Sequence, residues 1–295
     1  MSADSGLVIV DKPGGITSHD VVARIRRLAG TRRVGHAGTL DPMATGVLVI
    51  GVEKATRLLG HLMLADTEYT ATIRLGQATD TDDADGEIIA QAPATGITRE
   101  AIEAGAAALT GEIEQVPPGF SAIKVAGKRA YKMAREGAAP QLAARTVTVS
   151  SFVVGDVRRD GDLLDADVSV TCSTGTYIRA LARDLGAGLG VGGHLTALRR
   201  TRVGPYDTGQ ARTLEQLADS FTVMPLAQAA ARAFRHVNLT EDDARMLAHG
   251  RRLPASVLAG TPGAGPVAAF APDGALIALL SEEGGQARPL AVFVP

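Results

Sequence analysis

Residues 35 to 48 read GHAGTLDPMATGVL, a loop-like run between two apolar segments. Glycine permits backbone conformations, and a close approach of a ligand, that a side chain would block; the run contains Gly35, Gly38 and Gly46. Pro42 biases Asp41 away from helical geometry, which suits a loop that presents a carboxylate. On these residues alone Asp41 is a candidate catalytic group, although an ordinary Asp-Pro turn or a capping aspartate would look the same.

The segments around this run predict short, compact elements. Residues 7–10 are apolar and are followed by the turn residues DKPGG, which predicts a buried strand. Thr17 and Asp20 have the spacing of a helix capping box, so we expect a helix that starts there and ends at Gly30. A second buried strand is expected over residues 46–52, which places Asp41 in a loop just before a strand.

Further elements follow from the same kinds of pattern. Helices are expected over residues 55–64, 98–109 and 177–185, the last ending at Gly186. Strands are expected over residues 69–75, 145–157 and 163–172, the last two forming a hairpin around Asp160-Gly161. Helices and strands mix without strict alternation, so we predict an α+β fold.

The composition is that of an ordinary globular protein, with 45% hydrophobic and 21% charged residues among 295. No run approaches the roughly 18 apolar residues of a membrane helix, and no secretion signal is recognisable, so we expect a cytoplasmic protein with no membrane partner. Cys172 is the only cysteine, which excludes an intrachain disulfide and fits a reducing compartment. The composition shifts near Pro225, and we predict two domains, residues 1–224 and 225–295.

Charge is distributed unevenly along the chain, although the net charge is only −2. Residues 124–145 carry one acid, Glu136, against six basic residues: Lys124, Lys128, Arg129, Lys132, Arg135 and Arg145. Acidic residues concentrate in residues 80–87 and 156–167. Such segregation would suit a polyanion-binding face with a repelled opposite face, and the alternative is a set of solvated helix faces that happen to be basic.

Residues 35–48 closely resemble the signature motif of the TruB family of pseudouridine synthases. Five collinear segments make coincidence negligible, and the resemblance covers roughly residues 7–205. Besides residues 35–48, the matching segments are DKPGG with TSHD (residues 11–20), TEY (67–69), QVPP with SAIK (115–124) and CSTGTYIR (172–179), and the match extends to HLTALRR (194–200).

The resemblance implies an enzyme that isomerises uridine 55 in the T stem-loop of tRNA to pseudouridine. The aspartate matching Asp41 attacks the flipped-out uridine at the ribose or at the base. The reaction is redox-neutral, so no cofactor is implied. Burial under a base would raise the pKa of a carboxyl nucleophile, and Arg179 matches the family arginine that opposes this. We expect a monomer that needs no guide RNA.

Other residues receive roles from the resemblance alone. Tyr69 would stack on the flipped base and help to remove the C5 proton, and Tyr177 would line the same pocket. His36 would occupy the space that the base vacates. Supporting positions around the pocket or at the RNA are Lys12, Leu198 and Arg57. Without the resemblance, a strand tyrosine would be assigned to the core and a lone loop histidine to the surface.

Two segments are expected to hold RNA. Residues 121–145 match a family insertion that clamps the RNA loop, with Lys124, Lys128 and Arg129 as phosphate contacts. Residues 225–295 are expected to form a small β-rich domain like the PUA RNA-binding module. The implied catalytic fold is a mixed, mainly antiparallel sheet with flanking helices.

No metal site is predicted. The acidic stretch DTDDADG (residues 80–86) would place Thr81 and Ala92 at the first and last ligand positions of an EF-hand, which excludes that motif. The histidines lack the paired spacing of a metal site. Two other functions stay open: the same chemistry on another RNA, and a tRNA-folding chaperone whose catalysis is secondary.

Overall fold

The computed structural model describes residues 4–63, 65–120, 142–261, 263 and 265–293, together with the backbone of 124–125 and 128–129. The chain forms two compact units. Unit 1 comprises Met1–Leu40, Val47–Leu64 and Val203–Pro295, and unit 2 comprises Asp41–Gly46 and Ala65–Arg202. The chain therefore passes between the units more than once, and the Asp41 loop belongs to unit 2.

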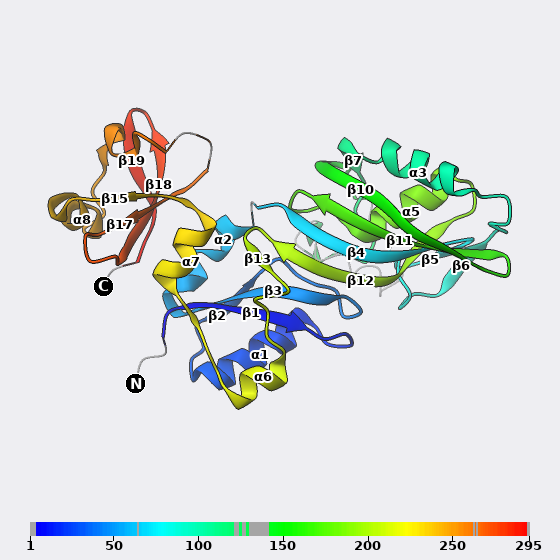
Figure 1. Ribbon diagram of the computed structural model, residues 1–295, viewed down its shortest axis with the longest axis horizontal. Coiled ribbons are helices and arrows are strands. Elements are labelled where there is room, and N and C mark those ends of the chain that lie inside the picture. Colours follow the sequence, from blue (N-terminus) through cyan, green and yellow to red (C-terminus); the bar gives the residue numbers. More distant parts are fainter. Residues whose placement is uncertain are drawn as a thin grey trace. The chain divides into compact units, whose positions relative to one another are not determined.

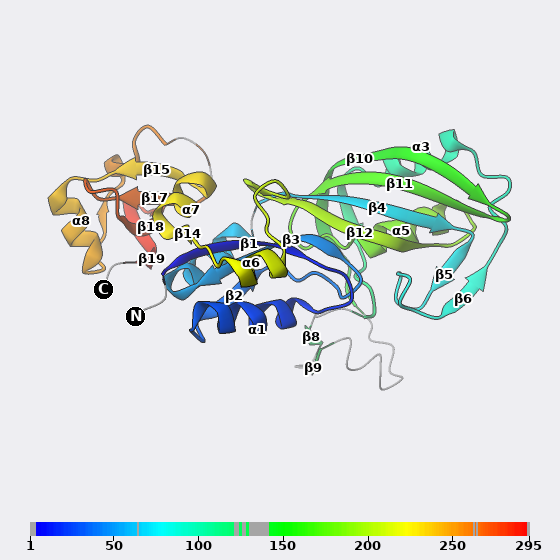
Figure 2. The same cartoon turned by 60° about the horizontal axis from the view of Figure 1, so that its bottom comes forward.

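Unit 1 begins with the elements that the local sequence predicts. Strand β1 (Gly6–Lys12) is followed by helix α1 (Ser18–Ala29), which buries Val21, Val22 and Ile25. Thr17 and Asp20 form the predicted capping box, and Gly30 ends the helix in the left-handed conformation with φ 64°. Figure 2 shows α1 and α6 (Leu214–Asp219) next to β1. The strand β3 (Thr45–Val52) comes after α1 in the chain.

Two details of unit 1 differ from the sequence prediction. Strand β2 (Val34–Ala37) was expected to be loop, but it pairs antiparallel with β3, from Val34 opposite Val52 to Ala37 opposite Val49. Its extended conformation is therefore set by a tertiary partner rather than by its own pattern. The helix expected over residues 55–64 is divided into the 3₁₀ helix η1 (Glu53–Arg57) and the short helix α2 (Leu59–Leu62).

The C-terminal part of unit 1 carries a second sheet, with strand order β15-β17-β18-β19-β16. Some of its buried residues join those of β1 and β3 in one cluster, which includes Leu7, Val49, Phe270, Leu279 and Phe293. Other buried residues of this sheet form a second cluster with those of α8. The element bounds are β13 (Tyr206–Asp207), β14 (Met224–Pro225), α7 (Leu226–Ala233), β15 (Arg235–Asn238), α8 (Glu241–Ala248), β16 (Leu253–Pro254), η2 (Ala255–Leu258), β17 (Val267–Phe270), β18 (Leu276–Glu283) and β19 (Gln286–Val292).

Unit 2 is built on a sheet with strand order β12-β4-β11-β10-β7, and Figure 1 shows these strands beside α3 and α5. The predicted hairpin is present, because β10 (Arg145–Asp160) and β11 (Leu163–Cys172) pair antiparallel. The other bounds are β4 (Thr67–Leu75), β5 (Gln77–Thr79), β6 (Ile88–Gln91), α3 (Arg99–Ala108), β7 (Gly111–Gln115), β8 (Lys124–Val125), β9 (Lys128–Arg129), α5 (Ile178–Gly188) and β12 (Gly193–Val203). The fold is α+β, as predicted.

Helix α5 continues past Gly186, where the sequence suggested that it would end. A Cβ on Gly186 would lie 2.2 Å from the backbone of Gly192 and Gly193. The glycine is thus required for close packing of the next segment, and not as a helix terminator. No helix within the described ranges is long and apolar enough to span a membrane.

Candidate active site

The Asp41 loop is fixed at its end by a backbone contact that only glycine allows. Gly46 has φ 99°, and a Cβ there would lie 2.2 Å from the carbonyl oxygen of Arg200. Gly46 and Arg200 are register partners where β3 and β12 pair in parallel. Within the loop, Ala44 donates its backbone N–H to the carbonyl oxygen of Asp41 at 3.1 Å. These contacts hold the loop that carries the carboxylate.

Arg179, in the first turn of α5, brings a buried cation to Asp41. Its Nε donates to Oδ2 of Asp41 at 2.9 Å. Its other nitrogens donate to backbone carbonyls, Nη1 to Thr81 at 2.8 Å and Nη2 to Phe120 at 3.0 Å. The Arg179 side chain is 4% exposed, whereas that of Asp41 is 34% exposed. The predicted pair is therefore assembled, with the cation buried and the carboxylate partly open.

A second carboxylate, which the sequence interpretation missed, faces the same arginine. Oδ2 of Asp83 lies 3.5 Å from Nε of Arg179, and the Asp83 side chain is only 6% exposed. Oδ1 of Asp83 accepts hydrogen bonds from the Thr81 hydroxyl at 2.6 Å and the Asp85 N–H at 3.1 Å. Arg179 thus balances one buried and one accessible carboxylate.

The neighbouring Asp82 is also buried beside an arginine. Arg183 lies one helical turn after Arg179 and donates to Oδ2 of Asp82 at 3.1 Å. Burial raises the pKa of Asp82 above its ordinary value, while the charge of Arg183 acts in the opposite direction. The interpretation of residues 80–87 as part of a repelled surface is therefore wrong for Asp82 and Asp83. The sequence did carry a signal for this burial: two arginines lie four residues apart on a helix with a buried face, where they need acidic partners.

Both arginines also anchor the segment that precedes residue 121. Arg183 donates to the Val116 carbonyl at 2.8 Å, as Arg179 does to Phe120. Gln115, at the end of β7, forms a double amide hydrogen bond with the backbone of Tyr177, at 2.8 and 3.1 Å. The residues expected to lead into the RNA-clamping insertion are thus tied to the start of α5.

The remaining predicted residues of unit 2 lie on its sheet or helix. Tyr69 is half-buried in β4 opposite Val170, and Tyr177 is the half-buried N-cap residue of α5. Leu198 is buried in β12 and lines an open groove of about 620 Å³ together with Met43. For Lys124, Lys128 and Arg129 only the backbone is described, as the β8–β9 pair, and most of residues 121–145 lies outside the described residues.

Three predicted residues belong to unit 1. His36 lies in β2 opposite Ile50, not in a loop, and its ring meets that of His19 edge to face at 5.9 Å. Lys12 is fully buried, and its Nζ donates to the carbonyls of Pro13 at 2.9 Å and Ile16 at 2.8 Å, which closes the turn before α1. The Arg57 guanidinium donates to the carbonyl of Val292.

The geometry of unit 2 suits nucleophilic catalysis by a carboxylate. A guanidinium hydrogen-bonded to Oδ2 favours the ionised form of Asp41, and 34% exposure of the side chain leaves it accessible to a substrate. Because Arg179 is held by two backbone carbonyls, the position of its charge is defined before any substrate binds.

Comparison with known families matches the chain along most of its length. Residues 26–178 match the TruB family pseudouridylate synthase N-terminal domain. Residues 179–237 match the tRNA pseudouridylate synthase B C-terminal domain, and residues 234–294 match the C-terminal domain of tRNA pseudouridine synthase II. The matches include Asp41 and Tyr69 in the first domain and Arg179 at the start of the second.

Similar proteins carry the same kind of description. A tRNA pseudouridine synthase B of Arthrobacter sp. (strain FB24) is 61% identical, over 99% of this chain and 97% of the relative. That of Thermobifida fusca (strain YX) is 61% identical over 98% of both chains. Among solved structures, a chain of an H/ACA RNP bound to a substrate RNA containing 2′-deoxyuridine has a TM-score of 0.73 and 27% identity, over 98% of this chain and 85% of that one. A chain of a Cbf5-Nop10-Gar1 complex has a TM-score of 0.74 and 28% identity, with the same coverage.

Proposed function

The chain belongs to the TruB family and is an isomerase that pseudouridylates tRNA, and from this we propose that it acts on uridine 55 of the T loop, with Asp41 as the nucleophile. The observation that carries the proposal is the 2.9 Å hydrogen bond from the buried Arg179 to the accessible Asp41 carboxylate. It supplies an ionised oxygen nucleophile in the loop that resembles the family signature.

We propose that the target base leaves the RNA stack and enters the pocket beside Asp41, with Tyr69 stacked on it and His36 filling the vacated space. Asp41 attacks the uridine, and the bond between N1 and C1′ breaks. The uracil turns and forms a bond from C5 to C1′, and the bond from Asp41 to the substrate breaks, which releases Asp41 as a carboxylate. The C5 proton is then lost, with Tyr69 as the candidate base, and N1 gains a proton. The sequence of steps is an isomerisation with no net redox change.

Arg179 has a further role in this scheme because it faces two carboxylates. A base stacked over Asp41 removes water from it, which would raise its pKa, and the adjacent guanidinium opposes that change. When Asp41 becomes covalently bound to the substrate, it loses its negative charge. The charge of Arg179 then stays balanced by Asp83, at 3.5 Å, so the buried cation is never left alone.

We further propose that residues 121–145, with Lys124, Lys128 and Arg129, contact the T arm and that residues 225–295 act as a PUA-like RNA-binding domain. The enzyme would act as a monomer without guide RNA. The 61% identity to proteins described as tRNA pseudouridine synthase B, against 27–28% to chains from H/ACA assemblies, supports action without guide RNA. The cytoplasmic location stays a prediction.

The experiment is site mapping in an unmodified tRNA transcript. The purified protein is incubated with this RNA and with a variant transcript that carries cytidine at position 55, and pseudouridine is then located by mass spectrometry of nuclease fragments. We expect one new pseudouridine, at position 55, and none in the variant. Conversion at a different position would refute the site assignment, and equal conversion of the variant transcript would show that another uridine is the target.

A further inference from the structure

A basic pocket lies at the end of α1, in unit 1. Its volume is about 650 Å³, and its lining residues are Arg26, Arg27, Gly30, Thr31 and Arg32. We propose that this pocket binds backbone phosphates of the substrate RNA, at nucleotides outside the one that is modified. The inference rests on the proposed function, because it takes tRNA as the ligand, and it adds a contact that neither the catalytic residues nor the insertion provides.

A purely structural role does not account for these arginines. Arg26 and Arg27 lie in the last turn of α1, where cations stabilise the helix dipole, and Arg26 donates to the Val34 carbonyl at 3.1 Å. Arg32, however, lies beyond the end of the helix. Arg27 and Arg32 are exposed, and neither forms an ion pair with any residue that the structure describes. Their charges are therefore available to a ligand.

The charges around the pocket favour an anion. The lining residues include no carboxylate within the described part of the chain. One acid contacts a lining residue: Glu53 accepts a hydrogen bond from the Thr31 hydroxyl, and it also lies 3.8 Å from Arg33. Glu53 is thus compensated by Arg33, and the pair adds no net charge beside Arg32. Guanidinium groups match phosphate oxygens with two parallel hydrogen bonds, which is why arginine is favoured at such contacts.

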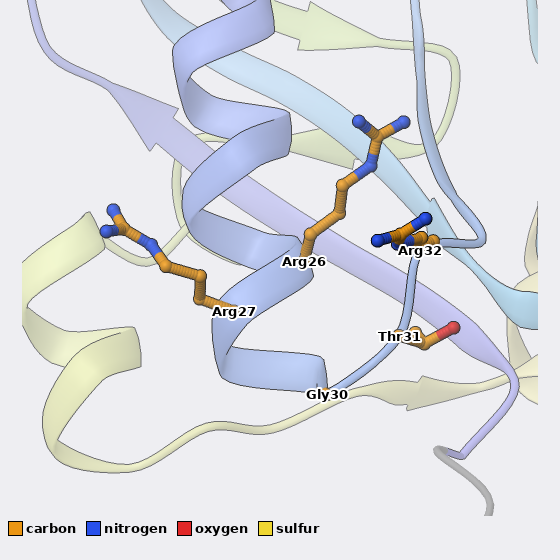
Figure 3. A pocket seen from close by; sticks show the side chains of 5 residues that line it. All are labelled: Arg26, Arg27, Gly30, Thr31 and Arg32. Carbon is orange, nitrogen blue, oxygen red and sulfur yellow. The ribbon is translucent and has the colours of Figure 1, made fainter.

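The directions of the side chains distinguish a polyanion from a small anion. In Figure 3, Arg27 extends from the helix away from Arg26 and Arg32, so the guanidinium groups do not converge on one point. A single phosphate or sulfate ion could not contact them all. A nucleic-acid strand presents phosphates at successive positions, and it can therefore engage groups that point in different directions.

Chain connectivity keeps the pocket within reach of RNA bound at the nucleophile. Arg32 and Asp41 are nine positions apart in the sequence. A fully extended chain spans at most about 3.3–3.6 Å per residue, so their Cα atoms are within roughly 30 Å of each other in any arrangement of the units. An RNA longer than this distance can therefore contact both the pocket and Asp41.

The test uses the double variant Arg27→Ala/Arg32→Ala, which leaves Arg26 and its bond to Val34 in place. The matched control, Arg99→Ala/Arg158→Ala, also removes two positive charges, but from arginines that are paired with Glu103 and Asp167. The affinity for unmodified tRNA is measured between about 50 and 200 mM salt. We expect the slope of log K against log salt to fall by roughly 1.4–1.8, which is the value for two lost phosphate contacts. KM should rise, with kcat at saturating tRNA unchanged.

The outcomes separate this inference from the proposed function. A wild-type protein that binds tRNA but forms no pseudouridine would refute the proposed function and leave the binding comparison valid. A double variant with wild-type affinity and salt slope would refute phosphate binding at the pocket. An equal loss of affinity and slope in the control variant would refute it too. If the alanine variant melts at a lower temperature, its weaker binding could come from lost stability. The variant Arg27→Lys/Arg32→Lys then separates the two causes, because it keeps both charges. Restored slope supports phosphate contact, and a slope as low as that of the alanine variant overturns it.

Discussion

Arg179 donates its Nε–H to Oδ2 of Asp41 across 2.9 Å, although 138 positions separate the two residues in the chain. Asp41 lies in a loop that glycine contacts hold in place, and Arg179 is fixed by the carbonyls of Thr81 and Phe120. The Asp41 carboxylate and its counter-ion are thus positioned by separate parts of unit 2. Each can be altered without directly disturbing the support of the other.

Replacing Asp41 with asparagine should abolish turnover and preserve tRNA binding. The amide keeps the size of the side chain but lacks the anionic oxygen that we propose attacks the uridine, so we expect activity to fall at least about a thousandfold. Asp83 remains 3.5 Å from Arg179, so the buried cation stays compensated and the fold should persist. Tritium release from C5-labelled tRNA and filter binding of the same tRNA test this. Turnover within tenfold of wild type would exclude Asp41 as the nucleophile.

Removing Arg179 should cost stability because Asp83 would be left buried without its cation. We expect Arg179→Ala to lower the free energy of unfolding by about 3–5 kcal/mol, the usual effect of breaking a buried pair. The double variant Arg179→Ala/Asp83→Asn should recover part of that loss and stay inactive. Urea unfolding of the two single variants and the double variant measures the coupling. Purely additive effects would show that Asp83 and Arg179 do not interact.

Replacing Gly46 with alanine should destabilise the chain more than the same change at Gly15. Both glycines have positive φ, 99° and 81°, so both substitutions carry a similar backbone penalty. Only at Gly46 would the new Cβ meet a backbone atom, the Arg200 carbonyl oxygen at 2.2 Å. We therefore expect the Gly46 variant to be less stable by a further 1–3 kcal/mol or so, from overpacking. Thermal melts of the two variants make the comparison, and equal melting temperatures would contradict it.

The Arg158–Asp167 pair should give unit 2 a small acid-dependent stability. Hydrogen bonding to Arg158, followed by that to Thr72, lowers the pKa of Asp167, against the opposing effect of burial. A carboxylate with a lowered pKa stabilises the fold above its unfolded pKa, about 3.9, and this contribution is lost as the pH falls further. Both side chains are substantially exposed, so Asp167→Asn should cost only about 0.2–1 kcal/mol at pH 7. Urea unfolding at pH 7 and pH 3 should show that the difference in unfolding free energy between variant and wild type becomes smaller at the lower pH. A difference that is the same at both pH values would rule out the Arg158–Asp167 pair as its source.

Removing residues 225–295 should unfold the rest of unit 1, as well as weaken tRNA binding. Phe270, Leu279 and Phe293 belong to the same buried cluster as Leu7 and Val49, so the truncation exposes apolar surface of β1 and β3. Hydrogen exchange of the β1 amides in the truncated and full-length chains tests this. Protection of β1 as strong as in the full chain would show that the cluster is dispensable.

The parts of the fold that the sequence predicts correctly are those with local causes. Helix α1 is bounded by its own capping box at Thr17 and by Gly30, and both signals lie within the segment. Strand β2 was missed because it owes its extended form to pairing with β3. The end of α5 was misplaced because Gly186 serves contacts with Gly192 and Gly193, which lie outside the helix.

The same distinction holds for the site. Asp41 and Arg179 stand in recognisable motifs, and the structure brings them together. The burial of Asp82 and Asp83 beside Arg183 and Arg179 depends on a loop packing against a helix about a hundred positions later. A count of charges along the chain cannot show this, and it assigned these acids to the surface. The roles of Tyr69 and His36 stay predictions.

The division of unit 1 among distant segments determines the order in which a nascent chain can complete its structure. Strand β1 has its edge partner in β14, with Gly6 opposite Pro225, so it must wait for most of the polypeptide to be synthesised. At ordinary rates of translation the delay is roughly ten to forty seconds, during which its apolar edge stays unpaired. Most of unit 2, residues 65–202, emerges from the ribosome as one continuous run within this interval. Unit 2 can therefore fold first, and the core that joins the N-terminal and C-terminal segments closes last.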